Sequence, residues 1–148
     1  MADSYENRIQ LDLHVAMVVF NPNTNSVVGI AAEDRVVADE SENYAGQYSN
    51  NMTLAKDAAD LEAIPGTFSG VRFMMIRVRH ENMVTTPVVG TFTAKITDTD
   101  GETDQVIVGD YLLIRNKNAH ITSVKLTNNE DDTSGVALPL AILMGGVN

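Results

Sequence analysis

Residues 71–79, VRFMMIRVR, form the densest block of β-favouring residues in the chain, and the rest of the fold is expected to be built around them. In an extended chain the apolar residues of this block fall on both sides, with Met74, Ile76 and Val78 on one and Val71, Phe73 and Met75 on the other. Arg77 and Arg79 then leave one side in water. The pattern predicts a central sandwich strand, buried at one end and emerging at the other.

Short strands and turn signals follow one another after this block. Asp98-Thr99-Asp100-Gly101 is a tight turn in which Asp-Gly supplies the positive φ that hairpins require. Turn signals every 8 to 12 residues are typical of an all-β antiparallel β-sandwich or jelly roll. We expect about eight to nine strands, those after the block being 91–97, 105–108, 111–115, 121–127 and 136–144.

The first strand changes character along its length. Apolar residues occupy every second position from Ile9 to Val19, which predicts one face on a core. Ala16, Val18 and Phe20 make the other face apolar as well, so something else, such as another subunit, is expected to cover the far end. Pro22 and the asparagines around it predict the turn that follows, and 26–32 returns as a shorter strand.

The final strand is apolar at nearly every position, including Val136, Leu138, Leu140 and Ile142. Pro139 lies inside it and cannot donate to a ladder. The strand is therefore expected at a sheet edge, or paired on one side only around the proline. One domain cannot easily hide both this strand and the first, so both are candidate interfaces between copies.

Between the second strand and the central block, the periodicity fails. Residues 33–52 contain the acidic and amide side chains expected of a long exposed loop. Tyr44 and Tyr48 either pin this loop to its own domain or anchor a contact with a neighbour. Residues 53–63 have helical spacing and predict at most one short helix, stopped by Pro65-Gly66.

Composition limits the classes of function. The 148 residues predict a single domain, and the absence of cysteine excludes disulfides and thiolate chemistry. The formal charge of −10 disfavours nucleic acid as a partner. The N-terminus is polar, and no apolar run approaches the ~20 residues that cross a bilayer, so we expect neither export by that route nor a membrane partner.

No stretch carries a reaction signature, so we expect no enzyme, cofactor or metal site. The carboxylates from Asp98 to Asp104 alternate around a glycine, but their spacing departs from that of a calcium loop and favours a solvated hairpin tip. The three histidines, His14, His80 and His120, lie apart and form no ligand pair. No serine occupies a strand-to-helix elbow.

An acidic, cysteine-free, turn-rich β domain of this kind resembles the small β-sandwich proteins of tailed-bacteriophage particles, particularly those that decorate or cement the capsid. The stretches that suggest it are GDYLLIRNKNAHITSVKLTNN (109–129) and GVALPLAILMGGVN (135–148). The resemblance implies a non-enzymatic structural protein of a virion, assembled in the host cytoplasm. It also implies a homo-oligomer, with a trimer favoured, bound to the major capsid protein or another virion protein.

The alternative hypothesis is a tail-fibre or adhesin-like module that binds a surface glycan or protein. Sugar rings stack on exposed aromatic residues, and the chain has no tryptophan, which favours assembly over glycan binding. The residues expected at an interface are Ala16, Val18, Phe20, Tyr44, Tyr48, Val136, Leu138, Leu140 and Ile142.

Overall fold

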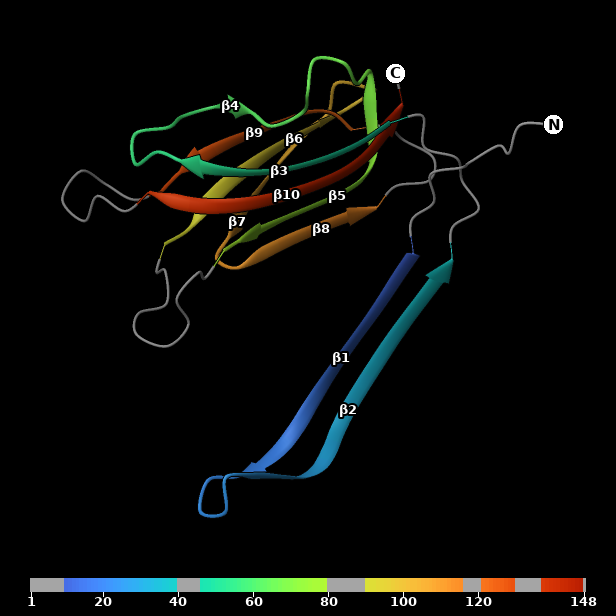
Figure 1. The fold of residues 1–148 in the computed structure, drawn as a ribbon, viewed down its shortest axis with the longest axis vertical. Coiled ribbons are helices and arrows are strands. Elements are labelled where there is room, and N and C mark those ends of the chain that lie inside the picture. Colours follow the sequence, from blue (N-terminus) through green and yellow to red (C-terminus); the bar gives the residue numbers. More distant parts are fainter. Residues whose placement is uncertain (1–9, 40–45, 80–89, 116–120, 130–136, 148) are drawn as a thin grey trace. The chain divides into compact units, whose positions relative to one another are not determined.

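The computed structural model describes residues 10–39, 46–79, 90–115, 121–129 and 137–147. Within these residues all regular structure is β-strand, and every strand pairing is antiparallel. The chain divides into two compact units, Met1–Asn43 and Tyr44–Asn148. The first contains a long hairpin of strands β1 (Gln10–Asn21) and β2 (Ser26–Asp39), and the second contains strands β3 to β10 (Figure 1). The sequence predicted one domain for 1–148; the two units are described separately below.

The second unit is a jelly roll. Its strands are β3 (Gly46–Leu54), β4 (Leu61–Glu62), β5 (Gly70–Val78), β6 (Phe92–Asp98), β7 (Thr103–Val108), β8 (Tyr111–Arg115), β9 (Ile121–Asn128) and β10 (Leu138–Val147). The first strand pairs with the last, β3 with β10, and the remaining pairs nest inside it as β4 with β9, β5 with β8 and β6 with β7. This nesting defines the jelly-roll topology.

Two further ladders complete two four-stranded layers. The β10–β5 ladder gives the layer β3-β10-β5-β8, and the β9–β6 ladder gives the layer β4-β9-β6-β7. β5 and β9 share one residue pair, Val71 with Ile121, so the hydrogen-bonded sheet turns a corner there and folds over itself (Figure 1). The prediction of an all-β antiparallel sandwich of jelly-roll type is confirmed, with ten strands in the described residues instead of eight to nine.

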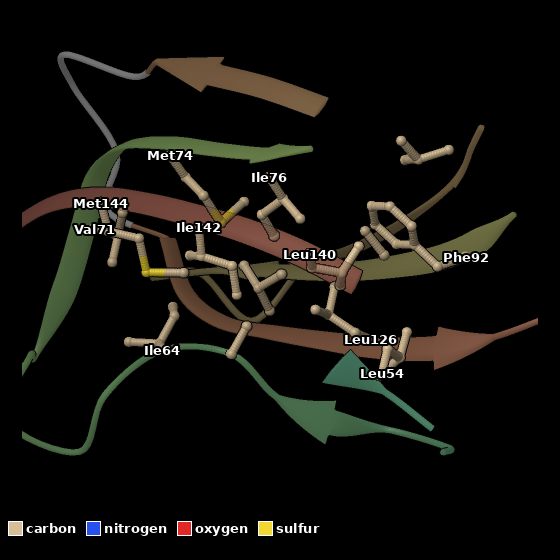
Figure 2. Close-up of a cluster of buried hydrophobic side chains, with 14 of the residues drawn as sticks. Leu54, Ile64, Val71, Met74, Ile76, Phe92, Leu126, Leu140, Ile142 and Met144 are labelled. Carbon is tan, nitrogen blue, oxygen red and sulfur yellow. The ribbon is translucent and has the colours of Figure 1, made fainter. Parts of the chain in front are cut away.

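The core lies between these two layers. Side chains of β5 and β10 meet those of β9 and β6, with Leu54 and Ile64 at the same cluster (Figure 2). The central block behaves as predicted: Met74, Ile76 and Val78 are buried in the core. Phe73 is buried on the opposite side of β5, whereas Arg77 is exposed. A bulge in the β5–β10 ladder brings Val71 into the core as well.

The predicted helix over 53–63 is wrong. Thr53 and Leu54 complete β3 and pair with β10, so the side chain of Leu54 enters the core from a strand. A turn follows, in which Asp60 adopts a positive φ of 50°, a conformation outside the right-handed helix. The pairing of this segment with two other strands overrides its helical spacing.

The long loop expected over 33–52 also differs from the structure. β2 (Ser26–Asp39) continues seven residues beyond its predicted end, and β3 begins at Gly46. Among the described residues of this stretch, the acidic and amide side chains of Glu33, Asp34, Gln47, Asn50 and Asn51 are exposed positions of these two strands, and residues 40–45 lie outside the described residues. Polarity alone does not distinguish an exposed strand from a loop.

The final strand is central to its layer. β10 lies between β3 and β5, whereas the sequence placed it at an edge or paired on one side around Pro139. The β10–β3 ladder includes Pro139, and the β10–β5 ladder begins one residue later, at Leu140. The proline therefore lies near the start of the strand, before the β10–β5 ladder begins, and its carbonyl oxygen accepts a hydrogen bond from the backbone N–H of Arg79 at 2.7 Å.

A close approach of the chain fixes one end of the β3–β10 pair. Gly46 and Gly146 are opposite each other in the ladder, and the ring of Phe68 lies against both. A Cβ atom at Gly46 would lie 2.5 Å from Cε1 of Phe68. One at Gly146 would lie 2.8 Å from Cδ2 of that ring and 2.7 Å from the carbonyl oxygen of Gly70. Only glycine fits at these two positions without displacing a neighbour.

Candidate assembly interface

The first unit is a long antiparallel hairpin, called the arm below. β1 (Gln10–Asn21) pairs along its whole length with β2 (Ser26–Asp39). The predicted turn between them is confirmed: Asn25 has a positive φ of 52°, and Asn21 Oδ1 accepts a hydrogen bond from the backbone N–H of Asn23. The asparagines thus supply both the left-handed backbone and the local acceptor that the turn needs.

One face of the arm is apolar along most of its length. Cross-strand pairs place β1 residues of odd number up to Met17 on the same side as β2 residues of even number. The apolar residues of this face are Leu11, Leu13, Val15, Met17, Val19, Ala32 and Val36. Met17 is 67% exposed and Val15 53% exposed. Asp34, opposite Val15, is the single charged residue among the described side chains of this face.

The opposite face is mostly polar in the half of the arm away from the turn, with Val37, opposite Asp12, as an exposed apolar residue there. Arg35 donates two hydrogen bonds to the carboxylate of Asp12, from Nε to Oδ1 at 3.0 Å and from Nη2 to Oδ2 at 2.8 Å. This pairing lowers the pKa of Asp12 and raises that of Arg35. His14 Nε2 lies 3.1 Å from Glu33 Oε2. Both pairs are exposed diagonal neighbours, and they fix the register more than they add stability.

Near the turn, this second face becomes apolar too, as the sequence predicted. It carries Ala16, Val18 and Phe20 from β1, with Ile30 opposite Val18 and Val27 opposite Phe20. Phe20 is 50% exposed and the others are exposed as well. Two register shifts, between Met17 and Val18 and between Val19 and Phe20, increase the local twist of the ribbon.

Such an arm is poorly suited to exist alone in water. A two-stranded hairpin without a third strand or a covering layer is at best marginally stable. Twelve paired residues at about 3.3 Å each, in two strands about 4.8 Å apart, give each face a footprint of roughly 400 Å². Apolar surface of this extent on both faces of the distal half indicates a contact with another protein.

The other residues predicted at the interface have different locations. Tyr44 and Val136 lie outside the described residues. Tyr48 is half-buried and packs against the sandwich core. Leu138, Leu140 and Ile142 are wrong as interface residues, because they are buried in the core of a single chain, facing the other layer. The apolar run of the last strand reflects its central position between two strands.

A second surface was missed by the sequence analysis. On the outer side of the layer β3-β10-β5-β8, register pairs align Met75 with Leu143 and Leu113, and Arg77 with Ala141 and Tyr111. A hollow of about 240 Å³ opens there, because Ala141 is small between longer side chains. It is lined by Ser49, Asn51, Met75, Arg77, Ala141, Ile142 and Leu143. This surface is called the outer apolar face below.

The signal for this face was present in the sequence. Met75 and Arg77 were assigned to one side of β5, but their neighbours could be found only once the pairing with β10 and β8 was known. The four strands of this layer contain three arginines and no acidic residue, in a chain whose net charge is −10. The layer is therefore a locally cationic part of an acidic protein.

The outer side of the other layer is mostly polar, although Ile107, opposite Thr93, is 74% exposed there. Its hollow, of about 310 Å³, is lined by Asp60, Thr93, Lys95, Gln105 and Thr127. The contrast between a polar and an apolar outer side indicates that the two layers have different surroundings.

The carboxylates from Asp98 onward form the predicted hairpin tip. Oδ1 of Asp98 accepts backbone N–H groups from Asp100 and Glu102, and Gly101 adopts a φ of 81°. In the described residues no group of three or more histidine, cysteine or acidic side chains could hold a metal ion. None of the described residues forms a helix able to span a membrane.

No protein-family model, curated protein or solved structure matches the chain. The jelly-roll topology therefore rests on the strand pairing itself, and the arm and the outer apolar face are the surfaces from which a function can be argued.

Proposed function

We propose that the protein is a non-enzymatic structural subunit that works by assembly, with the β1–β2 arm as its principal contact. The observation that carries this proposal is the apolar surface of the arm, which extends over one whole face and over both faces near the turn. Surface of this kind becomes stable when another chain removes it from water.

The particular assembly we propose is a virus particle, in which the chain decorates or cements the capsid. A jelly roll is common in viral capsid proteins, although lectins and cupins share it, so the fold alone does not decide the function. The resemblance to tailed-bacteriophage β-sandwich proteins points the same way. The proposed partners are copies of the chain itself, as a trimer, and the major capsid protein.

A single substitution tests the role of the arm. Met17→Glu places a charge on the apolar face, where burial at an interface would cost several kcal/mol, so self-association should weaken by about 100-fold. Gln10→Glu is the matched control, because it adds the same charge on the polar face of the same strand. Light scattering and sedimentation at micromolar concentration in 0.15 M salt measure both variants.

Three outcomes separate the hypotheses. An oligomer that dissociates with Met17→Glu and not with Gln10→Glu supports assembly through the arm, and copurification of the wild type with capsids supports the virion. A stable monomer that binds neither itself nor a capsid protein contradicts the proposal. A monomer that binds a glycan would instead favour the tail-fibre or adhesin-like module.

A further inference from the structure

The outer apolar face of the layer β3-β10-β5-β8 is a second exposed surface that needs an occupant. We infer that this occupant is the β1–β2 arm of a second copy, whose apolar face lies across β10 and β5. The inference rests on the proposed function and goes further, since it names the surface that receives the arm. The two surfaces belong to different molecules in this contact.

The charges on the two surfaces are complementary. Arg77 is the exposed arginine of the receiving layer, whose four strands contain no acidic residue. The apolar face of the arm presents the carboxylate of Asp34, whereas Asp12 and Glu33 lie on the polar face and pair with Arg35 and His14. The layer β4-β9-β6-β7, by comparison, mixes both signs on its strands. The face that presents Asp34 should therefore prefer the arginine-bearing layer.

One charged residue on each surface is complementary to a charge on the other. Asp34 is the one charge among the described side chains of the arm's apolar face, and Arg77 is an exposed charge within the outer apolar face. Neither Asp34 nor Arg77 forms an ion pair with another described residue, whereas Asp12 pairs with Arg35 and His14 with Glu33. In the contact, the carboxylate of Asp34 and the guanidinium of Arg77 would each gain the oppositely charged partner that its own surface lacks.

The arm and the outer apolar face also match in size. The hollow beside Arg77 measures about 240 Å³, which is room for an aliphatic side chain of the arm. Four strands about 4.8 Å apart give a layer roughly 19 Å wide, and the ten residues of β10 span about 33 Å. A ribbon about 10 Å wide can therefore lie over β10 and β5 along their length, with about 33 Å of its length of about 40 Å in contact.

Area then favours exchange over a single contact. About 33 Å of a ribbon about 10 Å wide covers roughly 330 Å² of the layer, so one contact buries about 660 Å² in total, which is the size of a crystal contact. If each copy donates one arm and receives one, two contacts bury about 1,300 Å², which is within the range of specific complexes. A closed oligomer, in which every arm and every outer apolar face is occupied, is thus the expected assembly.

A charge exchange tests the pairing of Asp34 with Arg77. Arg77→Glu alone and Asp34→Arg alone should each weaken self-association by about tenfold, and the double variant should restore it to within about threefold. Lys125→Glu, which makes the same charge change at an exposed position in the other layer, is the control and should leave association unchanged. Sedimentation equilibrium measures each dissociation constant.

Filling the hollow is a second, uncharged test. Ala141→Leu should weaken association, whereas Thr93→Leu, in the polar hollow of the other layer, should not. Far-ultraviolet dichroism and thermal unfolding confirm that each variant remains folded.

The outcomes distinguish this inference from the proposed function. If Met17→Glu dissociates the oligomer but neither Ala141→Leu nor the charge exchange changes it, the arms pack elsewhere and only this inference fails. If the single charge variants weaken association and the double variant does not recover it, the pairing is wrong. A wild-type monomer whose arm is protected from hydrogen exchange would show that each arm covers its own chain, which also overturns the inference.

Discussion

Replacing Gly146 by alanine should destabilise the sandwich by about 2 to 3 kcal/mol, the upper part of the range for overpacking. The added Cβ would lie 2.7 Å from the carbonyl oxygen of Gly70 and 2.8 Å from Cδ2 of Phe68, where ordinary contacts are 3.4 to 4 Å. Gly70 pairs with Val147 in the adjoining strand, so its oxygen cannot move unless β5 and β10 separate. The new methyl group can therefore be accommodated only by a shift of the paired backbone, which lowers the free energy of unfolding.

Urea denaturation followed by far-ultraviolet dichroism measures this effect. With a slope of about 2 kcal/mol per molar urea, a loss of 2 kcal/mol lowers the midpoint by about 1 M. Gly66→Ala is the matched control, because nothing lies within 4 Å of its new Cβ, and its midpoint should stay within about 0.25 M of wild type. A Gly146→Ala midpoint equally close to wild type would refute the reasoning.

Phe68 allows the contribution of the ring to be separated from that of the backbone. The edge of the ring with Cε1 meets Gly46 and the edge with Cδ2 meets Gly146, so the ring cannot move away from one glycine without approaching the other. Gly46→Ala should therefore also be destabilising, and Phe68→Ala should relieve most of that cost in the double variant. The same double variant with Gly146→Ala should recover less, because the oxygen of Gly70 remains.

Three further results are expected. Asp98→Ala should cost about 1 kcal/mol in the same urea assay, because two backbone N–H groups lose their acceptor. Asp98→Asn retains an Oδ1 oxygen that can accept both and should cost less. Arg35→Gln should raise the pKa of Asp12 toward its ordinary value in an NMR titration. Because the pKa of Asp12 is lowered in the folded arm, the Asp12–Arg35 pair stabilises the arm at neutral pH. This stabilisation disappears as the pH falls through the lowered pKa. An Asp12 titration that Arg35→Gln leaves unchanged would contradict the pairing. Leu140→Ala should cost about 2 to 5 kcal/mol and Leu143→Ala much less, since Leu140 is buried and Leu143 is exposed. Equal costs would contradict the assignment of the Leu140 side of β10 to the core.

Local patterns predicted the strands and turns well. Alternation identified β1, the density of β-favouring residues identified β5, and turn spacing identified β8. The Asp-Gly and asparagine turns have the positive φ values expected of them. These features depend on steric preferences of a few neighbouring residues, which the sequence contains directly.

The errors arose where pairing between distant strands decides the outcome. Leu138, Leu140 and Ile142 were assigned to an interface because an apolar strand at an edge must be covered, but β3 and β5 flank that strand on both sides. The segment 53–63 has helical spacing, yet Leu54 fills the core as part of β3. Pairing partners separated by so many residues leave no trace in a local window.

The candidate site divides in the same way. The exposed apolar positions Ala16, Val18 and Phe20 were predicted, because within a few neighbouring residues they make the second face of the strand apolar as well as the first. The outer apolar face was not, since Met75, Ala141 and Leu143 come from distant segments and meet only after the jelly roll has formed.

The nesting of the jelly roll also separates the chain into a fast and a slow part during folding. The arm closes through a turn of a few residues, and hairpins of this kind form in about 1 to 10 μs. Gly46 meets Gly146 only after a loop of roughly a hundred residues has closed, and β-sandwiches dominated by such pairings fold in milliseconds to seconds. The apolar ribbon is therefore exposed long before the outer apolar face exists. Refolding should accordingly be sensitive to chain concentration during this interval, with higher yields of native protein when chains are dilute until the sandwich has formed.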